Sequence, residues 1–176
     1  MSLPAERSGD THYGTTARVS RILMSEEAVY GLILVSGMIV VSYTITGTSL
    51  SALTTVIGTV VVFYAAHVYS GTLGRLAATE GKAGLPESIR AAARHSLGML
   101  LVSLVPIAVL LLGVTRAVDD DFAVWLALSV DTLALGILGW LAVSKWTSHF
   151  WLRLASALIT AAFGGVIILL KAFIHH

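Results

Sequence analysis

Residues 28–74 read AVYGLILVSGMIVVSYTITGTSLSALTTVIGTVVVFYAAHVYSGTLG and contain no charged side chain. One membrane-spanning helix needs roughly 20 predominantly apolar residues, so this stretch is long enough for two. Residues 47–49 (GTS) interrupt it near the middle, and glycine followed by small hydroxyl residues favours a tight turn. The stretch therefore predicts a hairpin of two transmembrane helices, over about residues 27–46 and 51–72.

The chain continues with three more apolar runs, which predict spans over about residues 94–115, 122–144 and 152–172. Lipid offers no hydrogen-bond partner to the backbone, and the sequence lacks the short alternating segments of a barrel, so the spans must be helices. We expect an all-α, polytopic membrane protein with five transmembrane helices. They would form a single domain over residues 25–174, after a tail over residues 1–24 that is expected to be cytoplasmic.

The composition excludes several classes of protein. Of the 176 residues, 56% are hydrophobic and only 12% are charged. A soluble domain carries roughly 25% charged residues, so an ordinary cytosolic enzyme, a nucleic-acid-binding protein and a disordered protein are excluded. The chain has no cysteine, which excludes disulfides, cysteine-ligated zinc and thiol catalysis. Because no GxSxG, HExxH, Walker A or GxGxxG motif is present, we expect neither an enzyme nor a bound cofactor.

The distribution of Lys and Arg predicts the orientation, because cytoplasmic segments are enriched in these residues. With the N-terminus inside and the C-terminus outside, only Arg116 and Lys171 fall on the outer side. The remaining basic residues fall on the inner side: Arg7, Arg18, Arg21, Arg75, Lys82, Arg90, Arg94, Lys145 and Arg153. We therefore predict a multi-pass protein of the plasma membrane with a cytoplasmic N-terminus. The acidic run 119–121 falls outside, where Asp121 or a neighbour is expected to cap the span over 122–144.

Asp131 is the sharpest candidate for a functional residue. It lies ten residues into the predicted span over 122–144, close to the middle of the membrane. An ionisable side chain at that depth is costly and is a functional-site hypothesis by default. One interpretation is a proton- or cation-binding group. The other is a protonated side chain that is hydrogen-bonded to Ser129, to Thr132 or to another helix.

A second group of ionisable residues is predicted to share one depth at the inner end of the spans. It contains Glu27, His67 and His95, with Tyr64 one turn from His67. Carboxylate and imidazole groups suit a proton relay or a divalent transition metal, for which Glu27, His67 and His95 are weak candidate ligands. The alternative is that each residue lies at a helix end independently of the others, because charged side chains reach water easily there.

Small residues recur every four positions along two of the predicted spans. They are Ala66, Ser70 and Gly74 in one, and Ala157, Ala161 and Gly165 in the other. Such spacing lets helices approach closely. It predicts either packing within the bundle or the contact surface of a homo-oligomer.

Three stretches resemble a small, uncharacterised family of membrane proteins from high-GC (actinobacterial-type) bacteria: EEAVYGLILVSGM (26–38), VVFYAAHVYSGTL (61–73) and VWLALSVDTLALGILGWLA (124–142). This resemblance implies that the plasma membrane in question is the bacterial inner membrane. The five-span order also resembles the vacuolar iron transporter family, whose dimers carry Fe²⁺ or Mn²⁺, often in exchange for protons. AHVYS (66–70) is similar to that family's GEYxS motif, which places His67 at the position of its Glu. The sequence departs from the family in lacking its DGL motif and the long Glu/Met-rich segment that would replace loop 72–92.

Two functions fit these features. The first is a small, oligomeric transporter or channel for protons or a cation, with Asp131 and His67 as the central residues. The second is a non-transporting accessory or assembly subunit, in which Asp131 pairs with a group outside this chain. The expected partners are the lipid bilayer, a second copy of the chain, and a proton or divalent cation; no nucleic acid is expected.

Overall fold

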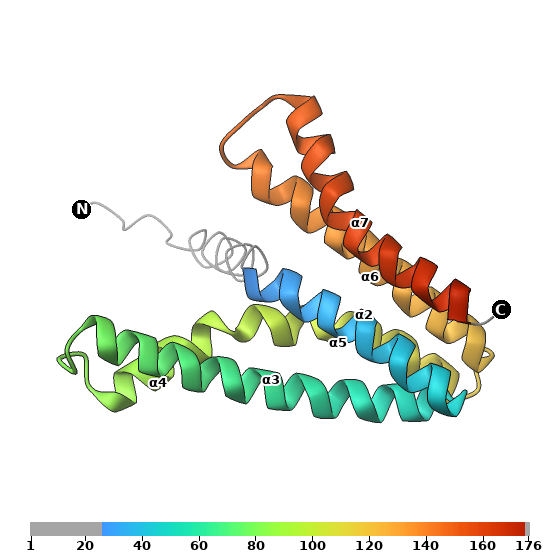
Figure 1. Cartoon of the computed structure of the whole chain (residues 1–176), viewed down its shortest axis with the longest axis horizontal. Helices are drawn as coiled ribbons and strands as arrows, with labels where there is room; N and C mark the ends of the chain where they lie inside the picture. The colour runs from blue at the N-terminus through green and yellow to red at the C-terminus, as the bar shows by residue number, and fades with distance from the viewer. Residues whose placement is uncertain (1–25, 175–176) are drawn as a thin grey trace, which may run out of the picture.

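The computed structural model describes residues 26–174, so the predicted tail over residues 1–24 lies outside the described residues. The described part is all-helical, which confirms the predicted class, and it contains no strand. Its helices are α2 (Glu26–Thr46), α3 (Ser49–Ala78), α4 (Leu85–His95), α5 (Leu97–Val114), α6 (Asp120–Ser144) and α7 (Phe150–Ile174) (Figure 1).

Within residues 26–174, five helical units are long and apolar enough to cross a membrane, as the sequence predicted. They are α2, α3, α6, α7 and the joined pair of α4 and α5, which runs over Leu85–Val114. Many of their large apolar side chains point outward, including Ile45 at 78% exposure and Phe173 at 84%. In water such a surface would aggregate, whereas in a bilayer it is covered by lipid chains.

The hairpin between α2 and α3 forms at the predicted turn. Helix α2 ends at Thr46 and α3 begins at Ser49. Gly47 adopts a positive φ of 68°, a conformation that glycine takes without steric cost. The Thr48 hydroxyl then accepts a hydrogen bond from the backbone N–H of Ser51 and caps α3.

The segment over 72–92 differs from the polar loop that the sequence suggested. Helix α3 continues to Ala78 and has 30 residues, or about 45 Å at 1.5 Å per residue, which exceeds the roughly 30 Å of hydrocarbon in a bilayer. Glycine makes close packing with α4 feasible, because a Cβ on Gly71 would lie only 3.1 Å from the Cβ of Ala92. The chain reverses between the two helices at Glu80 and Gly81, which both have positive φ. Composition alone did not reveal this helical hairpin.

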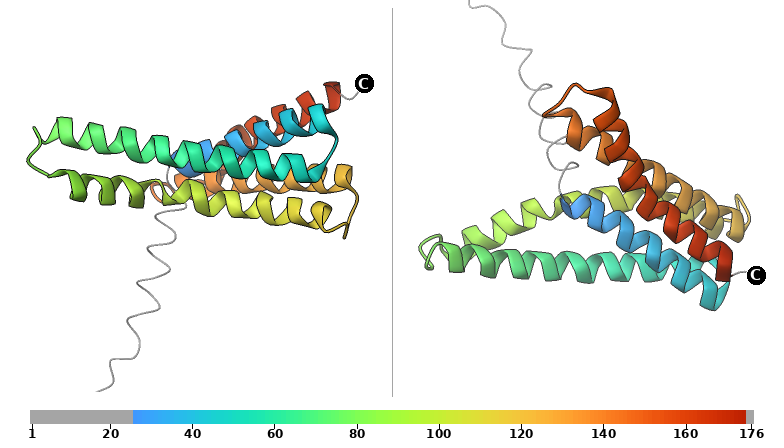
Figure 2. Two further views of the ribbon diagram at one scale, coloured as in Figure 1. Left: turned by 90° about the horizontal axis from the view of Figure 1, so that it is seen from below. Right: turned by 45° about the horizontal axis from the view of Figure 1, so that its top comes forward.

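Helix α2 lies at the centre of the bundle and packs against α3, α5, α6 and α7. Figures 1 and 2 show that the α6–α7 hairpin approaches the other helices at one end of the bundle and diverges from them at the other. We call the converging end, with the α2–α3 turn, the Lys171 end. The diverging end, with the start of α2 and the α6–α7 loop, is the His95 end.

Helices α6 and α7 pack closely through small residues. A Cβ on Gly139 would lie 2.7 Å from the carbonyl oxygen of Ser156, and Gly164 lies against Thr132. The Ser156 hydroxyl also donates to the carbonyl oxygen of Gly139 at 2.9 Å. Apart from this contact α7 is largely exposed, and its buried residues are Gly164 and Lys171.

Candidate functional site

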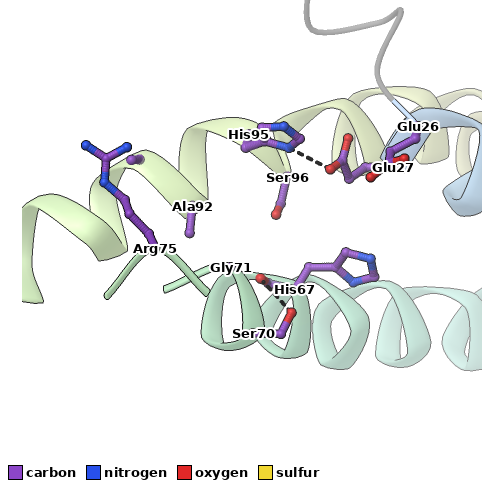
Figure 3. Close-up of a pocket in the computed structure, with 10 residues that line it drawn as sticks. Glu26, Glu27, His67, Ser70, Gly71, Arg75, Ala92, His95 and Ser96 are labelled. Atoms are coloured by element: carbon purple, nitrogen blue, oxygen red, sulfur yellow. Dashed lines mark hydrogen bonds and ion pairs between the residues drawn. The ribbon is translucent and has the colours of Figure 1, made fainter. Parts of the chain in front are cut away.

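A pocket of about 380 Å³ opens at the His95 end, between the start of α2, the middle of α3 and the junction of α4 with α5. Acidic, basic and hydroxyl side chains line much of it, with small residues between them (Figure 3). These residues are Glu26, Glu27, His67, Ser70, Gly71, Arg75, Ala91, Ala92, His95 and Ser96. The pocket therefore collects three of the predicted candidates, Glu27, His67 and His95, from three different helices.

Glu27 and His95 form the closest pair in this pocket. The Nδ1 atom of His95 lies 2.6 Å from Oε1 of Glu27. The Glu27 side chain is only 8% exposed, whereas that of His95 is 66% exposed. The second carboxylate oxygen of Glu27, Oε2, is buried and has no hydrogen-bond partner. A buried carboxylate oxygen without a donor is costly, so this atom is available to a proton, a water molecule or a cation.

His67 and Tyr64 lie near this pair without completing a metal site. The Nδ1 atom of His67 is 3.0 Å from the carbonyl oxygen of Phe63, and the Tyr64 hydroxyl donates to the carbonyl oxygen of Ala93 at 3.4 Å. Over residues 26–174, no three His, Asp or Glu side chains are grouped so that they could hold a metal ion. Glu27, His67 and His95, the weak candidate metal ligands, therefore line one pocket but are not grouped as a metal site.

Asp131 lies apart from the pocket, in the interior of the bundle. Its side chain is fully buried, and Ser36 of α2 donates a hydrogen bond to its Oδ2 atom at 2.8 Å. The neighbouring hydroxyls that the sequence suggested as partners instead bond their own helix, Ser129 to the carbonyl of Trp125 and Thr132 to that of Leu128. The Oδ1 atom of Asp131 has no partner.

The carboxyl groups of Glu27 and Asp131 contact α2 at different depths in the bundle. Glu27 precedes Ser36, the partner of Asp131, by nine residues, or about 13 Å of helix. Between them α2 buries apolar side chains such as Leu32 and Val35, both almost fully covered. Direct hydrogen bonding between the pocket and Asp131 is therefore not possible in this conformation.

A third ionisable group, at the Lys171 end, was not singled out from the sequence. The Lys171 side chain is only 1% exposed, and its Nζ lies 2.8 Å from Oδ1 of Asp121. The same ammonium lies 4.2 Å from the ring centroid of Trp125 and 5.1 Å from that of Tyr43, within the range of cation–π attraction. We call Tyr43, Asp121, Trp125 and Lys171 the Lys171 cluster. The signal was present, since the predicted topology placed Lys171 and the acidic run 119–121 on the same side.

The acidic run itself acts differently from the predicted helix cap. Asp119 occupies the N-cap position of α6, but its side chain makes no capping hydrogen bond. Asp120 instead accepts from the backbone N–H of Ser49 at 3.1 Å, at the start of α3, while Asp121 pairs with Lys171. These carboxylates therefore join α6 to other helices.

The two small-residue stripes have different surroundings. A Cβ on Gly136 of α6 would lie 3.5 Å from the Cβ of Ala161, so part of that stripe packs within the bundle. Ala66, Ser70 and Gly74 on α3 remain exposed. The stripe on α3 therefore stays the predicted contact surface of a homo-oligomer.

No model of a known protein family, no curated protein and no solved structure matches the chain.

Proposed function

We propose that this is a plasma-membrane protein that moves protons, alone or coupled to a cation, through a protonatable site at Asp131. The observation that carries the proposal concerns unsatisfied polar atoms. Within residues 26–174, the buried side-chain atoms that lack a hydrogen-bond partner are Glu27 Oε2 and Asp131 Oδ1. Buried polar groups are normally satisfied, so two open carboxylate oxygens in one small bundle call for a ligand. A proton is the smallest ligand that both can accept.

The orientation follows from the basic residues and gives the two ends different roles. We infer that the N-terminus is cytoplasmic, because that assignment leaves only Arg116 and Lys171 outside. The pocket with Glu27 and His95 then opens toward the cytoplasm. A 66%-exposed imidazole bonded to a buried carboxylate suits proton exchange between water and the protein.

Asp131 is closed to water in this conformation, so transport requires movement. Its side chain is fully buried, and apolar residues separate it from the pocket. The α6–α7 hairpin, whose helix α6 carries Asp131, diverges from the other helices at the His95 end (Figure 2). We infer alternating exposure, in which water reaches Asp131 from one side at a time.

The alternative function is a non-transporting accessory subunit, which the dry, fully packed surroundings of Asp131 would also fit. It predicted that Asp131 pairs with a group outside this chain. Asp131 instead receives its hydrogen bond from Ser36, and its side chain is covered by this chain alone. A carboxyl group that pairs with another subunit would be expected on the surface of the bundle.

The test is reconstitution of the full chain into liposomes that contain a pH-sensitive dye. A pH gradient is applied with the membrane potential clamped, and the external cation is varied across Na⁺, K⁺, Mg²⁺ and Mn²⁺. We expect a proton flux above that of protein-free liposomes. Equal dye signals with and without protein, for every cation, would contradict proton transport and leave the accessory role.

A further inference from the structure

The ammonium of the Lys171 cluster has a full set of partners, although the cluster takes no part in the proposed proton path. A lysine is almost never fully buried unless it is paired. Here the ammonium is held by Asp121 of α6 and by the ring faces of Trp125 of α6 and Tyr43 of α2. Three helices therefore meet around one buried charge.

The cluster lies between Asp131 and the Lys171 end of the bundle. On α6, Trp125 is six residues from Asp131, or about 9 Å. On α2, Tyr43 is seven residues from Ser36, or about 10 Å. Water that approached Asp131 from this end between α2, α6 and α7 would have to pass this layer.

Lys171 and two half-buried side chains, Ile167 and Ile168, which pack against the core, hold the end of α7 on the bundle. The buried residues of α7 are Gly164 and Lys171, and Gly164 packs against α6 about two turns away from Lys171. The side chains around Lys171 on α7, such as Leu169 and Phe173, are exposed at 69% and 84%. Release of the ammonium would therefore remove the polar anchor of the last turns of α7 and leave them held by apolar contacts alone.

We propose that Lys171 is a gating residue, whose buried charge closes the route from the Lys171 end to Asp131. Opening requires the ammonium to leave Asp121 and the two rings, after which the end of α7 separates from α2. This inference rests on the proposed function, because a gate has a role only if Asp131 is reached from that end. It predicts that neutralising Lys171 exposes the segment of α6 between the cluster and Asp131.

The absence of cysteine from the chain gives a clean test. Ala127 and Leu135 lie four residues before and after Asp131 on α6, and both are fully buried. Each is replaced separately by cysteine, and the protein is placed in nanodiscs, where both membrane faces are accessible. A charged, water-soluble methanethiosulfonate reagent is added, and labelling is followed by mass spectrometry.

We expect Lys171→Met to accelerate labelling at Ala127→Cys by about tenfold or more, and to leave labelling at Leu135→Cys unchanged. Asp121→Asn, which removes the more exposed partner, should give a smaller acceleration of about threefold and carries the test if Lys171→Met does not fold. The matched control is Arg116→Gln, which removes the other basic residue predicted outside and should change neither rate.

Two results would overturn the gate. One is an unchanged labelling rate at Ala127→Cys in both variants. The other is equal acceleration at Ala127→Cys and Leu135→Cys, which would show general loosening and hence a purely structural role. Neither readout requires proton flux, so the failure of the gate and the failure of the proposed function are distinguished.

Discussion

The two ends of the bundle contain the same kind of pair with opposite burial. At the His95 end the acid is buried and the base is exposed, with Glu27 at 8% and His95 at 66%. At the Lys171 end the base is buried and the acid is exposed, with Lys171 at 1% and Asp121 at 57%. The separations are similar, 2.6 Å and 2.8 Å.

The difference lies in how completely the buried partner is satisfied. The Lys171 ammonium has a carboxylate and two aromatic faces. Glu27 has one partner and a free buried oxygen beside a pocket. A satisfied buried charge holds helices together, whereas an unsatisfied one beside water is suited to exchange. We therefore expect substitutions to act mainly on stability at the Lys171 end and mainly on activity at the His95 end.

The largest stability effect is expected for Asp121→Asn. It leaves the buried Lys171 ammonium without its counter-ion, and breaking a buried pair in this way typically costs 3–5 kcal/mol. Because Asp121 is more than half exposed and the rings remain, we expect about 3 kcal/mol at most. Unfolding in mixed micelles measures the change. The control Asp119→Asn alters an exposed carboxylate without a capping bond and should leave the free energy of unfolding unchanged. An equal loss of stability in Asp121→Asn and Asp119→Asn would contradict the stabilising role of the Lys171–Asp121 pair.

A smaller loss is expected for Gly139→Ala, which tests whether α7 is held to α6 by close packing as well as by Lys171. The new Cβ would lie 2.7 Å from the carbonyl oxygen of Ser156, so the two helices must separate. Overpacking of this kind costs about 2 kcal/mol. Gly165→Ala is the matched control, because nothing lies within 4 Å of its Cβ position. If both variants unfold at the same denaturant concentration, the packing account is wrong.

The smallest stability effect is expected for His95→Gln. The imidazole is exposed, and the pocket lets water replace it on Glu27, so the loss should be about 1 kcal/mol or less. Proton flux should fall by about threefold or more if His95 passes protons to Glu27. His149→Gln removes an exposed histidine outside the pocket and should change neither quantity. A large loss of stability without a change in flux would reverse the expected roles of the two ends.

Much of the fold could be predicted from the sequence because membrane spans are coded locally. Apolar runs of sufficient length gave the five helices, and Gly47 marked the first turn. The predicted depths of Glu27, His67 and His95 also agree with their lining of one pocket. Depth follows from position along a span, so residues on different helices can be compared without knowledge of the fold.

Contacts that depend on which helices are neighbours could not be predicted. The partner of Asp131 is Ser36, 95 residues away, whereas the sequence drew attention to Ser129 and Thr132 nearby. The helical hairpin of α3 and α4 includes a close approach of Gly71 to Ala92, which the polar composition of that stretch conceals. The sequence predicted only that Lys171 lies on the outer side, because burial of a lysine shows only in three dimensions.

The most direct test of the account is proton flux through Asp131→Asn in liposomes. Asparagine keeps the size of the side chain and an oxygen that Ser36 can donate to, so the bundle should fold. We predict that flux falls to the level of protein-free liposomes, while Asp119→Asn retains the wild-type rate. Wild-type flux through a folded Asp131→Asn protein would contradict the account.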